Sequence, residues 1–103
     1  MKTESFEWDD NKSLTNIEKH GISFELASEV FADKSHISII DARKEYGETR
    51  HLTIGKIADL HIVVVVHTDR QNRIRIISAR KANAKERTLY NDKLKSQKTV
   101  RKS

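Results

Sequence analysis

The feature that most restricts the fold is the apolar run Ile62-Val63-Val64-Val65-Val66, which carries a branched aliphatic side chain at every position. Successive side chains of a β-strand point to opposite faces, so a strand made of this run is apolar on both. Such a strand is stable at the centre of a sheet that is covered on two sides. The segment from Leu60 to Thr68 is therefore predicted to be a central strand in a layered domain.

The remaining strands and the helices follow from side-chain periodicity and from capping residues. The strands are expected at Phe6–Trp8, His36–Ala42, about Arg50–Ile57 and Ile74–Lys81, with a turn at Asp69–Asn72. Asp9 is a good N-cap for a first helix that ends at His20 and is followed by Gly21. Ser23 is a good N-cap for a second helix, whose apolar stripe reaches Phe31. A third helix follows Lys81.

These elements predict an α+β fold, a small and mostly antiparallel sheet with two N-terminal helices and one C-terminal helix. The sheet would consist of a short N-terminal strand and a four-strand meander. With 103 residues, the chain has room for one domain, expected at residues 1–92. Residues 93–103 hold five cations and no acid, which fits either a solvated tail or an arm that follows nucleic acid.

Composition excludes several classes of chemistry. The chain has no cysteine, which excludes disulfides and thiolate chemistry, and its five histidines lack the spacing of a zinc site. We expect no metal site and no cofactor. The N-terminus lacks the apolar core of a signal peptide, and the longest apolar run is too short to cross a bilayer, so the expected location is the cytoplasm, with no membrane partner.

Charge is distributed unevenly along the chain. Residues 1–48 carry eleven acidic and six basic side chains, whereas residues 49–103 carry four acidic and fourteen basic ones. Such asymmetry suits a protein with an anionic partner for the basic half and a cationic partner for the acidic half. Strict alternation in the strand Ile74–Lys81 places Ile74, Ile76, Ser78 and Arg80 on one side and Arg73, Arg75, Ile77 and Ala79 on the other, so that apolar and cationic residues share each face.

Three groups of polar residues are candidates for a functional site, and each has a structural alternative. Lys19 and His20 could simply complement a helix dipole, and Glu48 with Arg50 could be a surface ion-pair set. The third group follows the last strand and consists of Arg80, Lys81, Glu86 and Tyr90. Glu86 and Tyr90 lie four residues apart on the helix stripe expected to face the sheet. The structural alternative for Glu86 is a salt bridge to Arg80 or to another nearby arginine.

Arginines, a lysine, a carboxylate and a tyrosine together suit the cleavage of RNA by its own 2′-hydroxyl. That reaction needs a base for the hydroxyl proton, cations for the charge that develops on the phosphoryl oxygens, and an acid for the leaving oxygen. Arginine forks bind phosphate oxygens in pairs. Two other classes remain open, a non-catalytic nucleic-acid-binding module and a pure protein-interaction partner.

The ordered motifs of the chain resemble the BrnT family of type II toxins. They are Phe6-Glu7-Trp8-Asp9, Asn16 with Lys19-His20-Gly21, Ser23-Phe24-Glu25 with Ala27, Val30-Phe31 and Asp33, Gly47-Glu48 with Arg50, Ile54-Gly55, and Ile74 to Ala82 leading to Glu86-Arg87 and Tyr90. Two positions depart from the family pattern: Lys34 stands where proline is frequent, and His67 where a phenol is common.

The resemblance implies a RelE-like fold and a cytoplasmic ribonuclease that inhibits translation. It also implies a cognate, BrnA-like antitoxin that neutralises the toxin in a hetero-oligomer and makes the DNA contacts when that complex represses its own promoter. The catalytic residues would be Glu48, Arg50, Arg80, Glu86 and Tyr90. The residues expected to bind RNA are Lys19, His20, Arg73, Arg75, Lys81 and Arg87.

Overall fold

The computed structural model describes residues 6–41, 48–58 and 61–101, with side chains described as far as residue 96. Ala42, Gly47 and Leu60, which the sequence analysis used, lie outside these ranges. The elements in chain order are β1 (Phe6–Glu7), α1 (Asp10–His20), α2 (Phe24–Ala27), the 3₁₀ helix η1 (Ser28–Ala32), β2 (Ile37–Asp41), β3 (Arg50–Ile57), β4 (His61–Arg70), β5 (Arg73–Lys81) and α3 (Ala84–Arg101).

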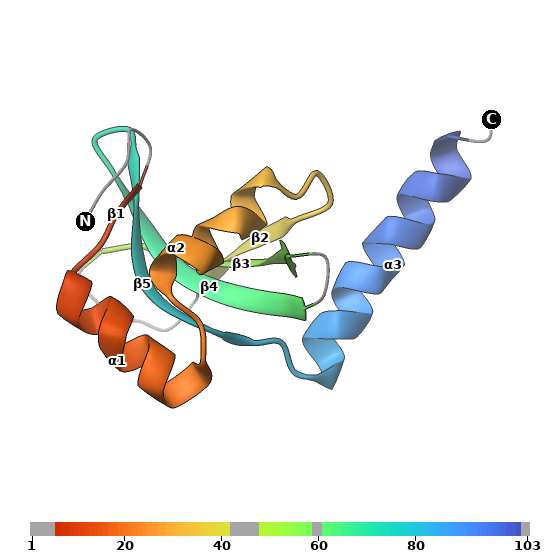
Figure 1. Cartoon of the computed structure of the whole chain (residues 1–103). Helices are drawn as coiled ribbons and strands as arrows, with labels where there is room; N and C mark the ends of the chain where they lie inside the picture. The colour runs from red at the N-terminus through yellow and green to blue at the C-terminus, as the bar shows by residue number, and fades with distance from the viewer. Residues whose placement is uncertain (1–5, 42–47, 59–60, 102–103) are drawn as a thin grey trace.

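The strands form one five-stranded sheet in the order β1-β5-β4-β3-β2, with β4 in the middle (Figure 1). The strands from β2 to β5 form an antiparallel meander, while β1 runs parallel to β5 through the pairs Phe6–Ile74 and Glu7–Arg75. The α+β prediction is confirmed, and the parallel β1 makes the sheet mixed.

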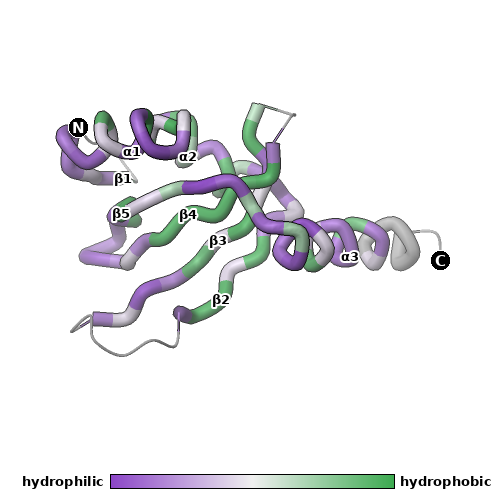
Figure 2. Tube along the Cα trace, turned by 90° about the horizontal axis from the view of Figure 1, so that it is seen from below, coloured by the Kyte–Doolittle hydropathy of each residue, from purple (hydrophilic) through white to green (hydrophobic). Residues whose placement is uncertain are grey.

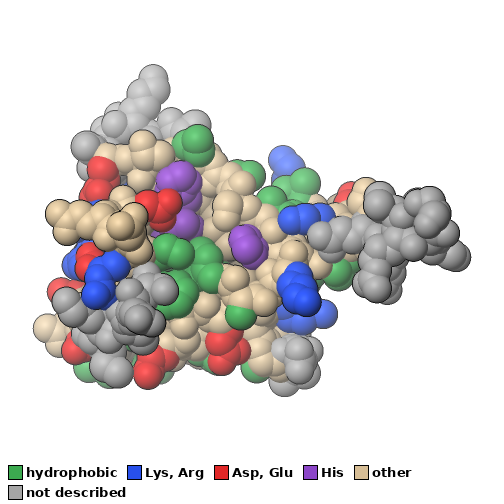
Figure 3. All heavy atoms as spheres, turned by 90° about the horizontal axis from the view of Figure 1, so that it is seen from above, with side chains coloured by type: hydrophobic (Ala, Val, Ile, Leu, Met, Phe, Trp, Pro, Cys, Tyr) green, Lys and Arg blue, Asp and Glu red, His purple; other side chains and the backbone are tan. Residues whose placement is uncertain are grey.

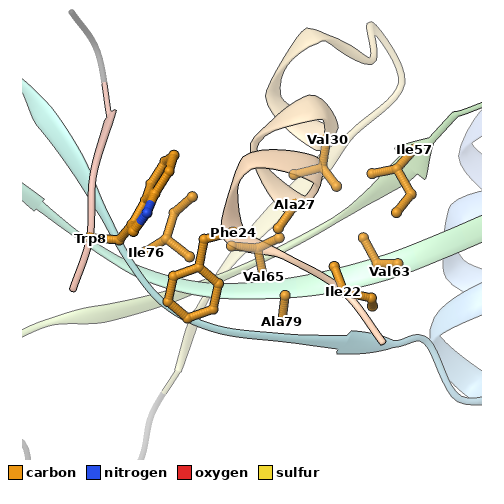
Figure 4. Close-up of a cluster of buried hydrophobic side chains, with 10 residues drawn as sticks. All are labelled: Trp8, Ile22, Phe24, Ala27, Val30, Ile57, Val63, Val65, Ile76 and Ala79. Atoms are coloured by element: carbon orange, nitrogen blue, oxygen red, sulfur yellow. The ribbon is translucent and has the colours of Figure 1, made fainter. Parts of the chain in front are cut away.

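Helices pack on both faces of the central strand. On one face, α2 and η1 cover a core that includes Phe24, Ala27, Val63 and Val65, all with no exposed surface (Figure 4). On the other face, Val64 of β4 packs in a second cluster with Tyr90 of α3. The two-sided burial predicted from the run Ile62–Val66 is therefore confirmed, because Val63, Val64 and Val65 are all fully buried.

The predicted helix caps are present. The carboxylate of Asp9 accepts hydrogen bonds from the N–H groups of Asn11 and Lys12, and Gly21 ends α1 in the left-handed conformation at φ 73°. Ser23 accepts a hydrogen bond from the N–H of Leu26 at the start of α2.

The second helix differs from its prediction, because it is α-helical only to Ala27 and continues as the tighter η1. In this segment Val30 lies directly on Gly55 of β3, where an added Cβ would come within 2.9 Å of the Val30 Cβ. The turn before β5 is also shorter than predicted, because β4 extends to Arg70. It consists of Gln71 and Asn72, both with positive φ, as the twist of a two-residue hairpin requires.

A β-bulge overturns the strict alternation predicted for β5. Val66 pairs with Ser78 but His67 pairs with Ile76, so Ile77 is an extra residue without an opposite partner on β4. Ile76 and Ala79 consequently lie in the same core beneath α2. The prediction that apolar and cationic residues share each face is wrong for residues 73–80, because the bulge shifts the alternation by one residue and places the arginines on the face opposite to Ile76 and Ala79.

Helix α3 leaves the body of the protein at the end of β5 and projects away from the sheet (Figures 1 and 2). It runs without a break across residue 92, where the sequence placed the beginning of a tail. Lys93 donates a 2.8 Å hydrogen bond to the carbonyl of His36, and Leu94 packs against the second core cluster. Among the described residues, no helix combines the length and apolar character needed to cross a membrane.

Candidate active site

The bulge gathers arginines on the sheet face that α3 packs against. Val64, Val66 and Thr68 alternate along β4 on this face, and their partners on β5 are Arg80, Ser78 and Arg75. The same alternation places Arg70 and its partner Arg73 on this face. Arg50 lies there as well, because Arg50 comes two residues before Leu52, which is the β3 partner of Val66. We call this surface the arginine face and define it by Arg50, Arg70, Arg73, Arg75 and Arg80.

Figure 2 shows the strands side by side, with α3 at one end and hydrophilic strand ends at the other. The arginine face extends between these two ends. Thr68 and Val64, the partners of Arg75 and Arg80, are four residues apart along β4, which corresponds to about 13 Å. The predicted site residues on this face therefore fall into two groups, one at each end.

At the α3 end, Arg80 and Glu86 form a bidentate ion pair with two hydrogen bonds of 2.8 Å. Glu86 also accepts from the N–H of Asn83, while the Asn83 side chain accepts from the N–H of Glu86, a reciprocal cap at the start of α3. The hydrogen bond from Arg80 lowers the pKa of Glu86 despite the opposing effect of burial. The side chain of Arg80 is 39% exposed, so the fork also meets solvent.

At the opposite end, Glu48 is paired with Arg70 through hydrogen bonds of 2.6 and 3.2 Å. This bond from Arg70 is the main cause of the lowered pKa of Glu48, and the charge of Arg50 contributes as well. Arg75 donates to Glu7 of β1 at 3.3 Å. The ion-pair alternative considered for Glu48 is thus realised, with Arg70 as the partner.

Tyr90 occupies a different environment from the other candidates. It is 2% exposed, and its hydroxyl donates a 2.5 Å hydrogen bond to the carboxylate of Asp33. Burial and this bond to Asp33 raise the pKa of Tyr90. Burial alone would raise the pKa of Asp33, but hydrogen bonds from Tyr90 and from the N–H groups of Ser35 and Lys56 lower it. The phenol therefore joins α3 to the segment that follows η1.

The structure separates the residues predicted to bind RNA. Arg73 and Arg75 lie on the arginine face, whereas Lys81 pairs with Val63 and points to the opposite side. Lys19 and His20 are exposed at the end of α1 and line a hollow next to Ser78. Arg87 donates a 2.8 Å hydrogen bond to the carbonyl of Ala82.

Sequence analysis missed a polar cluster on the side of the sheet that α2 covers. The buried ring of His67 stacks on His51 at 5.4 Å, and its Nε2 lies 2.7 Å from the hydroxyl of Thr53. That hydroxyl lies 2.7 Å from the hydroxyl of Ser38. Figure 3 shows histidine side chains next to hydrophobic ones on the side opposite to that in Figure 2. Alternation along the sequence places His51 and Thr53 on one face of a strand. Their contact with His67 of β4 depends on the pairing register between the two strands, which the sequence does not show.

The buried His67 makes folding sensitive to mild acid. Burial lowers its pKa below the ordinary value of 6.5, and the charge of Asp69 opposes this shift. The unfolded chain then binds the proton more readily, so the free energy of unfolding falls as pH drops through 6.5 towards the folded pKa. We expect a lower melting temperature at pH 5.5 than at pH 7.5, and a smaller difference in His67→Gln.

The exposed His61 provides the matched control, because His61→Gln should retain the full difference between the two pH values. The pKa values of Asp33 and Glu86 are lowered from ordinary values of 3.8 and 4.5, so these carboxylates titrate below the range from pH 5.5 to pH 7.5. An unchanged pH dependence in His67→Gln would show that His67 is not its source.

In the described part of the chain, no three histidine, aspartate or glutamate side chains are grouped as metal ligands.

The fold and the arginine face define a small α+β protein with a cationic sheet surface beside its last helix. Residues 8–86 match the family described as ribonuclease toxin, BrnT, of type II toxin-antitoxin systems, and the chain belongs to this family. Its structure is similar to the crystal structure of the ribonuclease toxin BrnT of Brucella abortus, with 30% sequence identity and a TM-score of 0.59 over 79% of this chain and 99% of the other. No curated protein sequence matches the chain.

Proposed function

We propose that this member of the family cleaves RNA on the arginine face, without a metal ion, and thereby inhibits translation. The observation that carries the proposal is the Arg80–Glu86 fork, which combines a solvent-accessible guanidinium with an ionised carboxylate at one end of a row of arginines. Arg80 and Arg50 would hold phosphate oxygens, and Arg73 and Arg75 would hold neighbouring parts of the RNA backbone.

In the proposed reaction, Glu86 or Glu48 takes the proton from a 2′-hydroxyl. The 2′-oxygen then forms a bond to the adjacent phosphorus, and the bond from phosphorus to the 5′-oxygen breaks. The 5′-oxygen leaves with a proton from an acid, and the other product ends in a 2′,3′-cyclic phosphate. Because the hydroxyl of Tyr90 is buried against Asp33 and Lys81 points to the opposite side of the sheet, we assign the acid to Lys85, which is exposed in the first turn of α3.

Cleavage in the presence of a chelator tests this function. We expect the purified protein to cut single-stranded RNA in excess EDTA, with products that end in a 2′,3′-cyclic or 3′-phosphate. An RNA with 2′-O-methyl groups at every position should remain intact, because it lacks the attacking hydroxyl. Loss of cleavage in EDTA with rescue by magnesium would overturn metal independence, and an inactive protein that still binds RNA would favour a non-catalytic binding module.

The family assignment supports further proposals about partners. We propose that a BrnA-like antitoxin neutralises the protein in a cytoplasmic hetero-oligomer, and that DNA is contacted only through the antitoxin of this complex. The toxin domain, predicted from the sequence at residues 1–92, would extend to Leu94, which packs in its core, and the basic residues that follow would attract RNA. Co-purification of the chain with the product of an adjacent gene, followed by loss of RNA cleavage, would support the neutralisation.

A further inference from the structure

The arginine face continues past Ser78 into a hollow between β5 and α1. This hollow has a volume of about 240 Å³, and Lys12, Thr15, Lys19 and His20 of α1 line it together with Ile77 and Ser78. Ser78 belongs to both surfaces, because its pairing with Val66 places it on the arginine face between Arg75 and Arg80. The hollow is therefore the lateral extension of that face at the β5 edge.

Two features of the fold create the hollow. Among the described residues, the β1–β5 pairing consists of the pairs Phe6–Ile74 and Glu7–Arg75, and the bulge residue Ile77 follows shortly after them. Beyond it, Asn16 of α1 binds the edge of β5 with its amide, donating to the carbonyl of Ala79 at 2.9 Å and accepting from its N–H at 3.2 Å. Asn16 thus fixes α1 at the strand edge.

The same attachment orients a cationic stripe. Lys12 and Lys19 lie one helical turn before and one after Asn16, on the side of α1 that faces β5. Lys19 near the end of α1 complements the helix dipole, but Lys12 lies in the first turn, where the dipole disfavours a cation. The helix dipole therefore does not account for Lys12, whereas an anion in the hollow would interact favourably with both lysines.

We propose that Lys12, Lys19 and Ser78 form a phosphate subsite for the RNA backbone, next to the phosphate held by Arg80. This proposal rests on the proposed function and extends it, because it states the route of the RNA: across the β5 edge at the bulge and beneath α1. Ser78 lies two residues from Arg80, about 7 Å along the strand, so the two sites belong to one continuous path. None of the described residues around the hollow is acidic.

The salt dependence of RNA binding tests the subsite. The probe is a single-stranded 2′-O-methyl RNA, which the protein should bind without cutting, and its dissociation constant is measured at several salt concentrations. Log affinity falls as log salt rises, and each lost phosphate contact makes this negative slope shallower by about 0.7. We expect this change in Lys12→Gln and in Lys19→Gln, and an affinity loss on the order of tenfold at 0.1 M salt in the double variant.

Lys34→Gln is the matched control, because it removes one exposed lysine outside the hollow and should leave the slope unchanged. Slopes of Lys12→Gln and Lys19→Gln equal to that of Lys34→Gln would overturn the subsite. Loss of antitoxin binding with unchanged RNA slopes would overturn it as well, because the lysines would then serve a protein partner. Failure of the wild-type protein to cleave ordinary RNA would refute the proposed function, while the slopes would still decide the subsite.

Discussion

Replacing Arg80 by alanine is expected to slow RNA cleavage by about 100- to 1,000-fold, with little change in melting temperature. The guanidinium lies at the surface of the arginine face, so its removal leaves no cavity in the core. Its hydrogen bonds would strengthen as negative charge develops on the phosphoryl oxygens, which is why the loss should affect the rate of the chemical step. Single-turnover cleavage and thermal melting of the same preparation measure both quantities.

Two control variants separate catalysis from stability. Val64→Ala removes a fully buried side chain from the central strand and should lower the melting temperature while activity per folded molecule is retained. Glu86→Ala removes both the partner of Arg80 and part of the α3 cap, so it should lose stability as well as activity. If Arg80→Ala loses stability as Glu86→Ala does but is fully active per folded molecule, Arg80 has a structural role only.

Replacing Tyr90 by alanine is expected to destabilise the fold by about 3–5 kcal/mol, the largest stability effect that we predict. Tyr90 fills the core between α3 and Val64, and its hydroxyl holds Asp33. Tyr90→Phe keeps the ring but leaves Asp33 without this donor, and should cost about 1–3 kcal/mol. Chemical denaturation of both variants gives these differences in the free energy of unfolding.

The activity of Tyr90→Phe decides between a structural and a catalytic role for the phenol. Because the hydroxyl is buried against Asp33, we expect the folded variant to cleave RNA at the rate of the wild-type protein. A stable Tyr90→Phe protein that binds RNA but does not cleave it would identify the phenol as the acid, contrary to this expectation.

Local sequence signals were sufficient for much of the fold. Asp9 and Ser23 cap their helices through neighbouring residues, and the run Ile62–Val66 shows its two-sided burial in its own composition. The Arg80–Glu86 pair was also within reach as an alternative for Glu86, since only six positions separate the two residues. Each of these features depends on a short segment of the chain.

Features that depend on pairing between distant segments could not be predicted in the same way. The bulge at Ile77 exists only in the register between β4 and β5, and without it the arginines cannot be assigned to one face. Tyr90 and Asp33 are 57 residues apart, and Glu48, which precedes β3, has its partner Arg70 at the end of β4. The sequence supplied the residue types of the candidate site, while the pairing register determined which of them meet.

The most direct test of the central claim is to map where RNA contacts the protein. A 2′-O-methyl RNA that carries 4-thiouridine can be cross-linked by ultraviolet light, and the attached peptides can be identified by mass spectrometry. We predict cross-links to β5 and to the first turn of α3, around Arg75, Ser78 and Arg80. Cross-links confined to η1 and β2, near His51 and His67 on the opposite side of the sheet, would contradict the assignment of the arginine face as the site of cleavage.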